Sequence, residues 1–216
     1  MAATARHGLL ITLEGPDGAG KSMQAGVLAE RLAASGRRVL LTREPGGTPL
    51  GERIRDLLLN VEAGARDPLG DAFLFNAARR QLVADVIRPA LEDGVVVICD
   101  RFADSTLAYQ GHGGGAPVAD LDALARVSTG GLRPDRTVLF DVPVEAGLAR
   151  RQGGDAAQLN RFETSEQHDR AFHERVRAGY LAMAAAEPER WRVIDGAGEP
   201  ADVSSRVWAG VADLFG

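Results

Sequence analysis

The chain has little cysteine, little lysine and no long apolar run. Its single cysteine, Cys99, lies in the apolar run 95–99, so the 216 residues cannot form an internal disulfide framework, and a reducing cytosol fits. No apolar stretch approaches the roughly 18 residues that a membrane span needs, and residues 1–8 lack the apolar core of a signal peptide. We therefore expect a cytoplasmic protein that does not bind a membrane.

Basic residues are outnumbered, with 25 Lys and Arg against 30 Asp and Glu, which gives a net charge of −5. This balance argues against broad contact with nucleic acid or with anionic lipid, although a local group of arginines can still hold a small phosphate ligand. The length and the 45% hydrophobic content suit a single α/β domain over residues 1–216.

Only one of the basic residues is a lysine, and it lies in the most informative motif. Residues 15–22 follow the spacing G-x-x-x-x-G-K-[ST], between a predicted strand at 9–14 and a predicted helix at 21–35. Glycines leave backbone N–H groups open to phosphate oxygens, and a helix N-terminus adds partial positive charge. Lys21 would reach the β- and γ-phosphates of a nucleotide, and the Ser22 hydroxyl would bind Mg²⁺. The predicted residues for binding the ATP phosphates are Gly15, Pro16, Asp17, Gly18, Ala19, Gly20, Lys21, Ser22 and Met23.

Apolar runs and helical patterns alternate along the rest of the chain. Strands are predicted at 38–42, 95–100, 137–142 and 191–195, and helices at 50–60, at 68–93 with a bend near Pro89, and at 200–215. Strands that are separated by helices form a parallel sheet through right-handed crossovers. The fold class is therefore α/β, with ligands expected at the carboxyl edge of a five-stranded sheet.

Charged residues gather where the predicted strands end. An acid at the end of an apolar strand near a P-loop is the usual carboxylate for Mg²⁺, which is the interpretation we favour for Asp100; a structural pair with Arg101 is the alternative. Asp141 and Asp195 could equally cap the turns that follow them.

Two further stretches bear on a ligand pocket. Phe75 and Arg79 are spaced i, i+4 on a predicted helix, so a ring and a guanidinium could together read a base, although residues 73–75 could also all be core. Residues 111–115 are rich in glycine and are interpreted as a flexible loop.

Several segments together resemble the thymidylate kinases. They are Glu14–Ser22, Arg43–Gly47, Ala78–Val83, Asp100–Arg101, Ser105–Thr106, Ala108–Gly111 and Arg133–Asp135, and they run in order through most of the chain. The resemblance implies a three-layer P-loop kinase fold with a mobile lid, transfer of the ATP γ-phosphoryl group to the 5′-phosphate of dTMP with Mg²⁺, and a homodimer.

The resemblance also implies roles for individual residues. Asp17 would approach the 3′-hydroxyl of dTMP, Arg43 and Arg101 would hold its phosphate, and Phe75 would stack on thymine. Arg79 would bond the thymine O4, with Thr106 near the base edge, and Tyr109 would disfavour a 2′-hydroxyl. The predicted dTMP-binding residues are Asp17, Arg43, Phe75, Arg79, Arg101, Thr106, Tyr109 and Gln110.

Kinases of this kind carry catalytic arginines in the P-loop or in a lid. The four residues between Gly15 and Gly20 include no basic one, so the predicted lid at 150–163 must provide them; a solvated linker with surface arginines is the alternative. The predicted catalytic residues are Lys21, Arg101, Arg150, Arg151 and Arg161, and the predicted metal ligands are Ser22 and Asp100.

Two other functions stay open. Another nucleoside monophosphate kinase or a deoxynucleoside kinase would share the sheet and P-loop and differ in the base pocket. A nucleotide-dependent switch is a different class. The lone lysine excludes the Asn-Lys-x-Asp guanine motif, and Arg101 stands where an ATP-driven switch usually has an acid, so both observations favour a kinase.

Overall fold

The computed structural model of the chain describes residues 8–59, 67–152 and 170–216. Its centre is a five-stranded parallel sheet in the order β2-β3-β1-β4-β5. The strands are β1 (Leu10–Glu14), β2 (Val39–Arg43), β3 (Val96–Asp100), β4 (Arg136–Asp141) and β5 (Trp191–Asp195). The predicted α/β class and all five predicted strands are confirmed, each to within one residue at either end.

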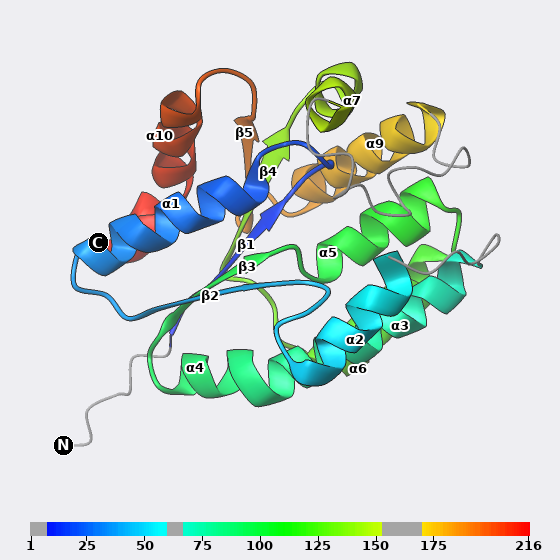
Figure 1. Cartoon of the computed structure of the whole chain (residues 1–216), viewed down its shortest axis with the longest axis horizontal. Helices are drawn as coiled ribbons and strands as arrows, with labels where there is room; N and C mark the ends of the chain where they lie inside the picture. Colours follow the sequence, from blue (N-terminus) through cyan, green and yellow to red (C-terminus); the bar gives the residue numbers. More distant parts are fainter. Residues whose placement is uncertain (1–7, 60–66, 153–169) are drawn as a thin grey trace.

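Helices cover both faces of the sheet (Figure 1). On one face, α1 (Lys21–Ala34) and α10 (Pro200–Val211) pack on every second strand residue, including Ile11, Leu13 and Phe140. The alternate residues, Leu10 and Val97 among them, point to the opposite face. Because both faces of the inner strands β1, β3 and β4 are buried, these strands appear in the sequence as largely apolar runs rather than as alternating patterns.

The opposite face carries most of the remaining helices. The chain there forms α2 (Pro49–Leu59), α3 (Pro68–Leu82), α4 (Arg88–Glu92), α5 (Ala103–Thr106), α6 (Val118–Thr129) and α9 (Arg170–Ala186), while α7 (Val144–Gln152) follows β4. The end of α3 and the residue before α5, Phe102, pack on β1 and β3, and α9 packs on β4 and β5. Among the described residues, no helix is long and apolar enough to cross a membrane.

The helix predicted over 68–93 is interrupted by a π-helical turn at Val83–Ile87. In this turn the Arg88 N–H donates to the Val83 carbonyl, five residues back. The next residue, Pro89, has no N–H and its ring would crowd the preceding turn of an uninterrupted α-helix; it stands in the first turn of α4, where that N–H is not needed. The predicted helix is therefore divided into α3, the π-helical turn and α4, and the bend expected near Pro89 stays a prediction.

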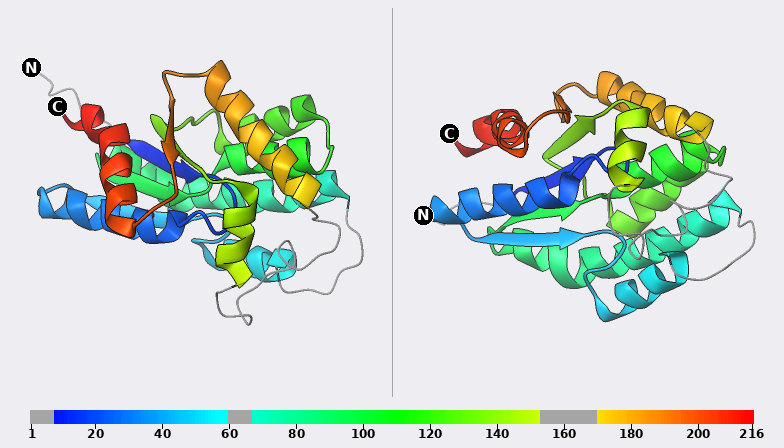
Figure 2. Two further views of the ribbon diagram at one scale, coloured as in Figure 1. Left: turned by 90° about the horizontal axis from the view of Figure 1, so that it is seen from above. Right: turned by 45° about the horizontal axis from the view of Figure 1, so that its top comes forward.

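The first part of the glycine-rich stretch 111–115, up to Gly113, is helical and largely buried, so the prediction of a flexible loop is wrong there; Gly114 and Gly115 follow it as an exposed turn. Residues Leu107–Gly113 form a second π-helical segment that runs alongside α9 (Figure 2). A Cβ on Gly113 would lie 2.7 Å from side-chain atoms of Phe172 and Val176, and one on Gly179 would lie 2.5 Å from His112. Glycine fits these two positions because side chains of the facing segment fill the space that a Cβ would need, which composition alone does not reveal.

Candidate active site

The loop between β1 and α1 forms the predicted phosphate cradle. Gly15, Gly18 and Gly20 have φ angles of 139°, 73° and 86°, which favour glycine, and a Cβ on Gly15 would lie 2.6 Å from the Phe140 carbonyl oxygen. The Lys21 Nζ donates to the Pro16 carbonyl at 2.8 Å and so crosses the loop. Burial, followed by the nearby charge of Arg101, lowers the pKa of Lys21 to about 8.

A cavity of about 380 Å³ lies next to this loop. Most of the predicted site residues line it: Asp17, Gly18, Gly20, Lys21, Ser22, Met23, Arg43, Phe75, Asp100, Arg101, Thr106, Tyr109 and Gln110. Five lining residues were not among the predicted ones: Glu44, Pro45, Arg55, Leu59 and Ser105. Gly15, Pro16 and Ala19 belong to the loop without lining the cavity, and Arg79 does not line it either.

Ser22 and Asp100 meet at the cavity, where the serine hydroxyl donates a short hydrogen bond to the Asp100 carboxylate. The pairing of β1 with β3 places Leu13 opposite Asp100 and so brings the end of β3 beside the P-loop. Two hard oxygen donors side by side suit Mg²⁺, which binds through a few protein oxygens together with phosphates and water.

Arg101 turns away from Asp100 and toward the P-loop. Its φ of 68° is the one positive value of a non-glycine residue in the described parts of the chain. The guanidinium contacts Asp17 Oδ1 at 2.5 Å and Tyr109 Oη at 3.1 Å, and Tyr109 itself donates to Asp17 Oδ2 at 2.9 Å. Left-handed backbone at a site residue is held by its surroundings, here by this network. The alternative of a structural Asp100–Arg101 pair has no support, because Arg101 forms its ion pair with Asp17.

Two more arginines face the same cavity from the β2–α2 region. Arg43 pairs with Glu52 at 3.1 Å and remains about half exposed, and Arg55 donates to the Pro45 carbonyl at 2.9 Å. Burial, followed by the nearby charge of Arg43, lowers the pKa of Arg55. No motif in the sequence singles out Arg55, which reaches the cavity because α2 packs beside the loop that carries Pro45.

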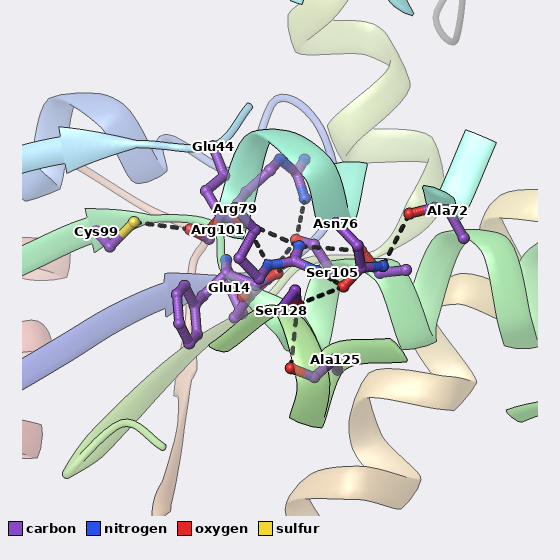
Figure 3. Close-up of polar contacts among 12 residues, drawn as sticks. Glu14, Glu44, Ala72, Asn76, Arg79, Cys99, Arg101, Ser105, Ala125 and Ser128 are labelled. Carbon is purple, nitrogen blue, oxygen red and sulfur yellow. Dashed lines mark hydrogen bonds and ion pairs between the residues drawn. The ribbon is translucent and has the colours of Figure 1, made fainter. Parts of the chain in front are cut away.

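The two α3 residues that were predicted to read a base, Phe75 and Arg79, differ in their burial. Phe75 lines the cavity and packs on residues of α2 and α3, whereas Arg79 is 1% exposed. Figure 3 shows Arg79 between Glu44 and Asn76; its Nε donates to Glu44 at 2.8 Å and its Nη1 to Asn76 at 3.0 Å. Its Nη2 donates to Thr106 Oγ1 at 3.0 Å. Arg79 therefore lies behind the cavity wall and fixes residues that form it.

Another acidic residue, which no sequence motif singles out for a role of its own, lies beneath Arg101. Glu14 is fully buried at the end of β1, and its carboxylate accepts from the Phe102 N–H at 2.7 Å, from Ser105 at 2.6 Å and from Tyr180 at 2.9 Å. Burial, reinforced by the charge of Asp104, raises the pKa of Glu14 to about 7.

Two strand-end acids lie outside the cavity. Asp141 forms an ion pair with Arg177 at 2.6 Å, and Asp195 accepts from the Ala197 N–H at 2.8 Å, the turn cap that was one of its two interpretations. The predicted lid arginines are not placed in the site: Arg161 and the side chains of Arg150 and Arg151 lie outside the described residues.

A P-loop on the central strand, a strand-end carboxylate beside its serine, and a cavity lined by arginines define a P-loop phosphotransferase. The comparisons with known proteins identify the family. The thymidylate kinase family model matches residues 13–207, so the chain belongs to the thymidylate kinase family.

Curated relatives and solved structures agree with this family. A thymidylate kinase of Thermomicrobium roseum is 53% identical over 95% of each chain, and one of Deinococcus radiodurans is 48% identical over 96% of this chain and 98% of its own. The crystal structure of thymidylate kinase from Ehrlichia chaffeensis superposes with a TM-score of 0.71 at 36% identity and covers 87% of this chain and 93% of that one.

Proposed function

We propose that the chain transfers the γ-phosphoryl group of ATP to the 5′-phosphate of dTMP. The observation that carries this proposal is the cavity itself, in which Lys21 and Ser22 of the P-loop share one space with Arg101, Phe75 and Tyr109. A donor phosphate chain and a nucleotide acceptor can therefore meet in line within one enclosure.

The acceptor end of the cavity suits a pyrimidine deoxynucleotide. Arg43 and Arg101 hold the acceptor phosphate, Phe75 stacks on the base, and Tyr109 lies against the sugar with Asp17 near its 3′-hydroxyl. Thr106 and Gln110 line the base side, supported from behind by Arg79.

The donor end holds ATP and Mg²⁺. The P-loop amides and Lys21 bind the phosphates, and Ser22 and Asp100 hold the metal, whose charge offsets that of the phosphates. The acceptor is a phosphate oxygen, which is already a good nucleophile, so positioning and charge neutralisation supply the rate without a general base.

The remaining catalytic charge comes from the lid. We assign the lid to residues 150–163 of a single kinase domain, with Arg150, Arg151 and Arg161 closing on the transferring phosphoryl group. Support comes from the P-loop, where residues 16–19 include no basic side chain.

We also propose a homodimer, which the resemblance to the family implies and two exposed apolar residues support. Phe73 on α3 is 56% exposed and Val127 on α6 is 73% exposed, and these two helices pack side by side. We expect wild-type protein to sediment as a dimer and Phe73→Glu and Val127→Glu to sediment as monomers. Val193→Glu, at another exposed apolar residue, on β5, should remain dimeric; a monomeric wild type would remove the dimer from the proposal.

The reaction is tested by ADP release with ATP and Mg²⁺ against dTMP, dUMP, dCMP, dAMP, dGMP, UMP and thymidine. We expect rapid turnover with dTMP and weaker turnover with dUMP. Preference for another monophosphate would keep the reaction class and overturn the base assignment, and no turnover with any of them would overturn the proposal.

Arg101→Ala tests the placement of the acceptor phosphate. Because Arg101 is proposed to hold that phosphate, the change should greatly reduce phosphoryl transfer while ATP binding, measured by calorimetry, persists. Wild-type activity in this variant would contradict the placement.

A further inference from the structure

Arg101 has a second set of partners below the cavity, on the side away from Asp17. Its Nη1 donates to Ser105 Oγ at 3.1 Å and, more weakly, to Tyr180 Oη at 3.4 Å. Both hydroxyls also contact one oxygen of Glu14, at 2.6 Å and 2.9 Å, and they lie 2.9 Å from each other. The four side chains come from β1, the β3–α5 turn, α5 and α9, so the cluster joins parts of the chain that are far apart in sequence.

The number of hydrogens that these groups carry limits which of them can donate and which must accept. A hydroxyl carries one hydrogen, so Ser105 and Tyr180 can each donate once. Both donate to Glu14 Oε2, the carboxylate oxygen within reach, while Oε1 accepts from the Phe102 N–H. Only lone pairs of the two hydroxyls are then left to face Arg101, and a guanidinium has donors and no acceptor. The carboxylate thereby turns two hydroxyls into acceptors for Arg101.

We propose that Glu14 is a positioning residue for the acceptor phosphate: through the hydroxyls of Ser105 and Tyr180 it holds the Arg101 guanidinium in place for that phosphate. Glu14 does not line the cavity, whereas Ser105 and Arg101 do, so its action is indirect. The contact with Asp17 fixes one edge of the guanidinium, and the cluster under Glu14 fixes the other. This inference rests on the proposed role of Arg101 toward the phosphate of dTMP.

The test compares two ligands that differ only in that phosphate, dTMP and thymidine, by calorimetry on the full chain. In Glu14→Gln, an amide replaces the carboxylate at the same size. The amide N–H₂ either faces the Phe102 N–H, donor against donor, or donates to the two hydroxyls. In the second arrangement the hydroxyl hydrogens turn toward Arg101, which has only donors of its own. We expect dTMP affinity to fall by roughly tenfold or more, as for the loss of a hydrogen bond to a charged group, with thymidine affinity within about twofold of wild type.

Glu44→Gln is the matched control, because Glu44 is also buried but pairs with Arg79 on the base side. It should weaken dTMP and thymidine by similar factors. Tyr180→Phe keeps the ring in its apolar cluster and removes one acceptor for Arg101. It should therefore lower dTMP affinity more than thymidine affinity, by a smaller factor than Glu14→Gln, and it tests the inference even if the Glu14 variant fails to fold. In an Arg101→Ala background, Glu14→Gln should cause no further loss of dTMP affinity.

The outcomes separate the inference from the proposed function. If the wild-type protein binds dTMP no more tightly than thymidine, the role of Arg101 fails, and the inference fails with it. If the wild type discriminates and both Glu14→Gln and Tyr180→Phe weaken the two ligands equally, or leave both unchanged, the inference alone is overturned.

Discussion

Lys21 shows how the surroundings of a residue set the conditions in which it works. Its pKa is lowered to about 8 by burial and by Arg101, so the free enzyme loses this positive charge as the pH rises through that value. Since kcat/KM reports the free enzyme, we expect kcat/KM for ATP to fall above pH 8, approaching about tenfold per pH unit.

The control for Lys21 is the pH profile of kcat/KM for dTMP at saturating ATP. Bound phosphates favour the charged ammonium, so this profile should stay level to higher pH. A kcat/KM for ATP that stays flat well above pH 8 would contradict the role of Lys21 as the charged phosphate ligand.

Phe75 is the residue on which base recognition depends most directly. Phe75→Ala removes the cavity-lining ring, so we expect KM for dTMP to rise by the equivalent of about 1–3 kcal/mol, with kcat little changed. Phe73→Ala, two residues earlier, is the matched control: Phe73 is assigned to the dimer surface and does not line the cavity, so with the dimer kept by working at high protein concentration this KM should stay near wild type. Steady-state kinetics decides, and equal effects from the two variants would place the base elsewhere.

At the scale of elements, the sequence predicts what depends on local pattern. The strands and the P-loop could be located because apolar runs buried on both faces and a fixed glycine spacing are visible in one dimension. The turn at Val83–Ile87, the burial of Arg79 and the cluster under Arg101 could not, because each depends on which distant segment packs there. Glu14 meets Tyr180 across 166 positions of sequence, and no spacing rule reaches that far.

The π-helical segment at Leu107–Gly113 gives an element-scale prediction, since it carries Tyr109 and Gln110 into the cavity and lies close against α9. Gly113→Ala places a methyl group 2.7 Å from Phe172 and Val176, so it should destabilise the fold by about 1–3 kcal/mol and raise KM for dTMP. Gly26→Ala is the control: a methyl group on this α1 glycine would meet no atom of another segment within 4 Å, and the change should stabilise by roughly 0.4–1 kcal/mol. Urea denaturation measures both, and the prediction fails if Gly113→Ala is as stable as Gly26→Ala.

At the scale of the whole molecule, the site draws on elements that pack on both faces of the sheet, α1 on one and α2, α3 and α5 on the other. A ligand that bridges them binds the folded chain and not the unfolded one, so it stabilises the entire domain. At a hundred times its Kd, dTMP should add about 2.7 kcal/mol, a rise in Tm of roughly 5–10 °C for a chain of this size. Arg101→Ala should lose most of this rise at the same dTMP concentration while keeping the shift caused by ATP, because the two ligands contact different ends of the cavity. Scanning calorimetry measures both shifts, and a larger rise with dCMP or dGMP than with dTMP would assign the cavity to a different nucleoside monophosphate.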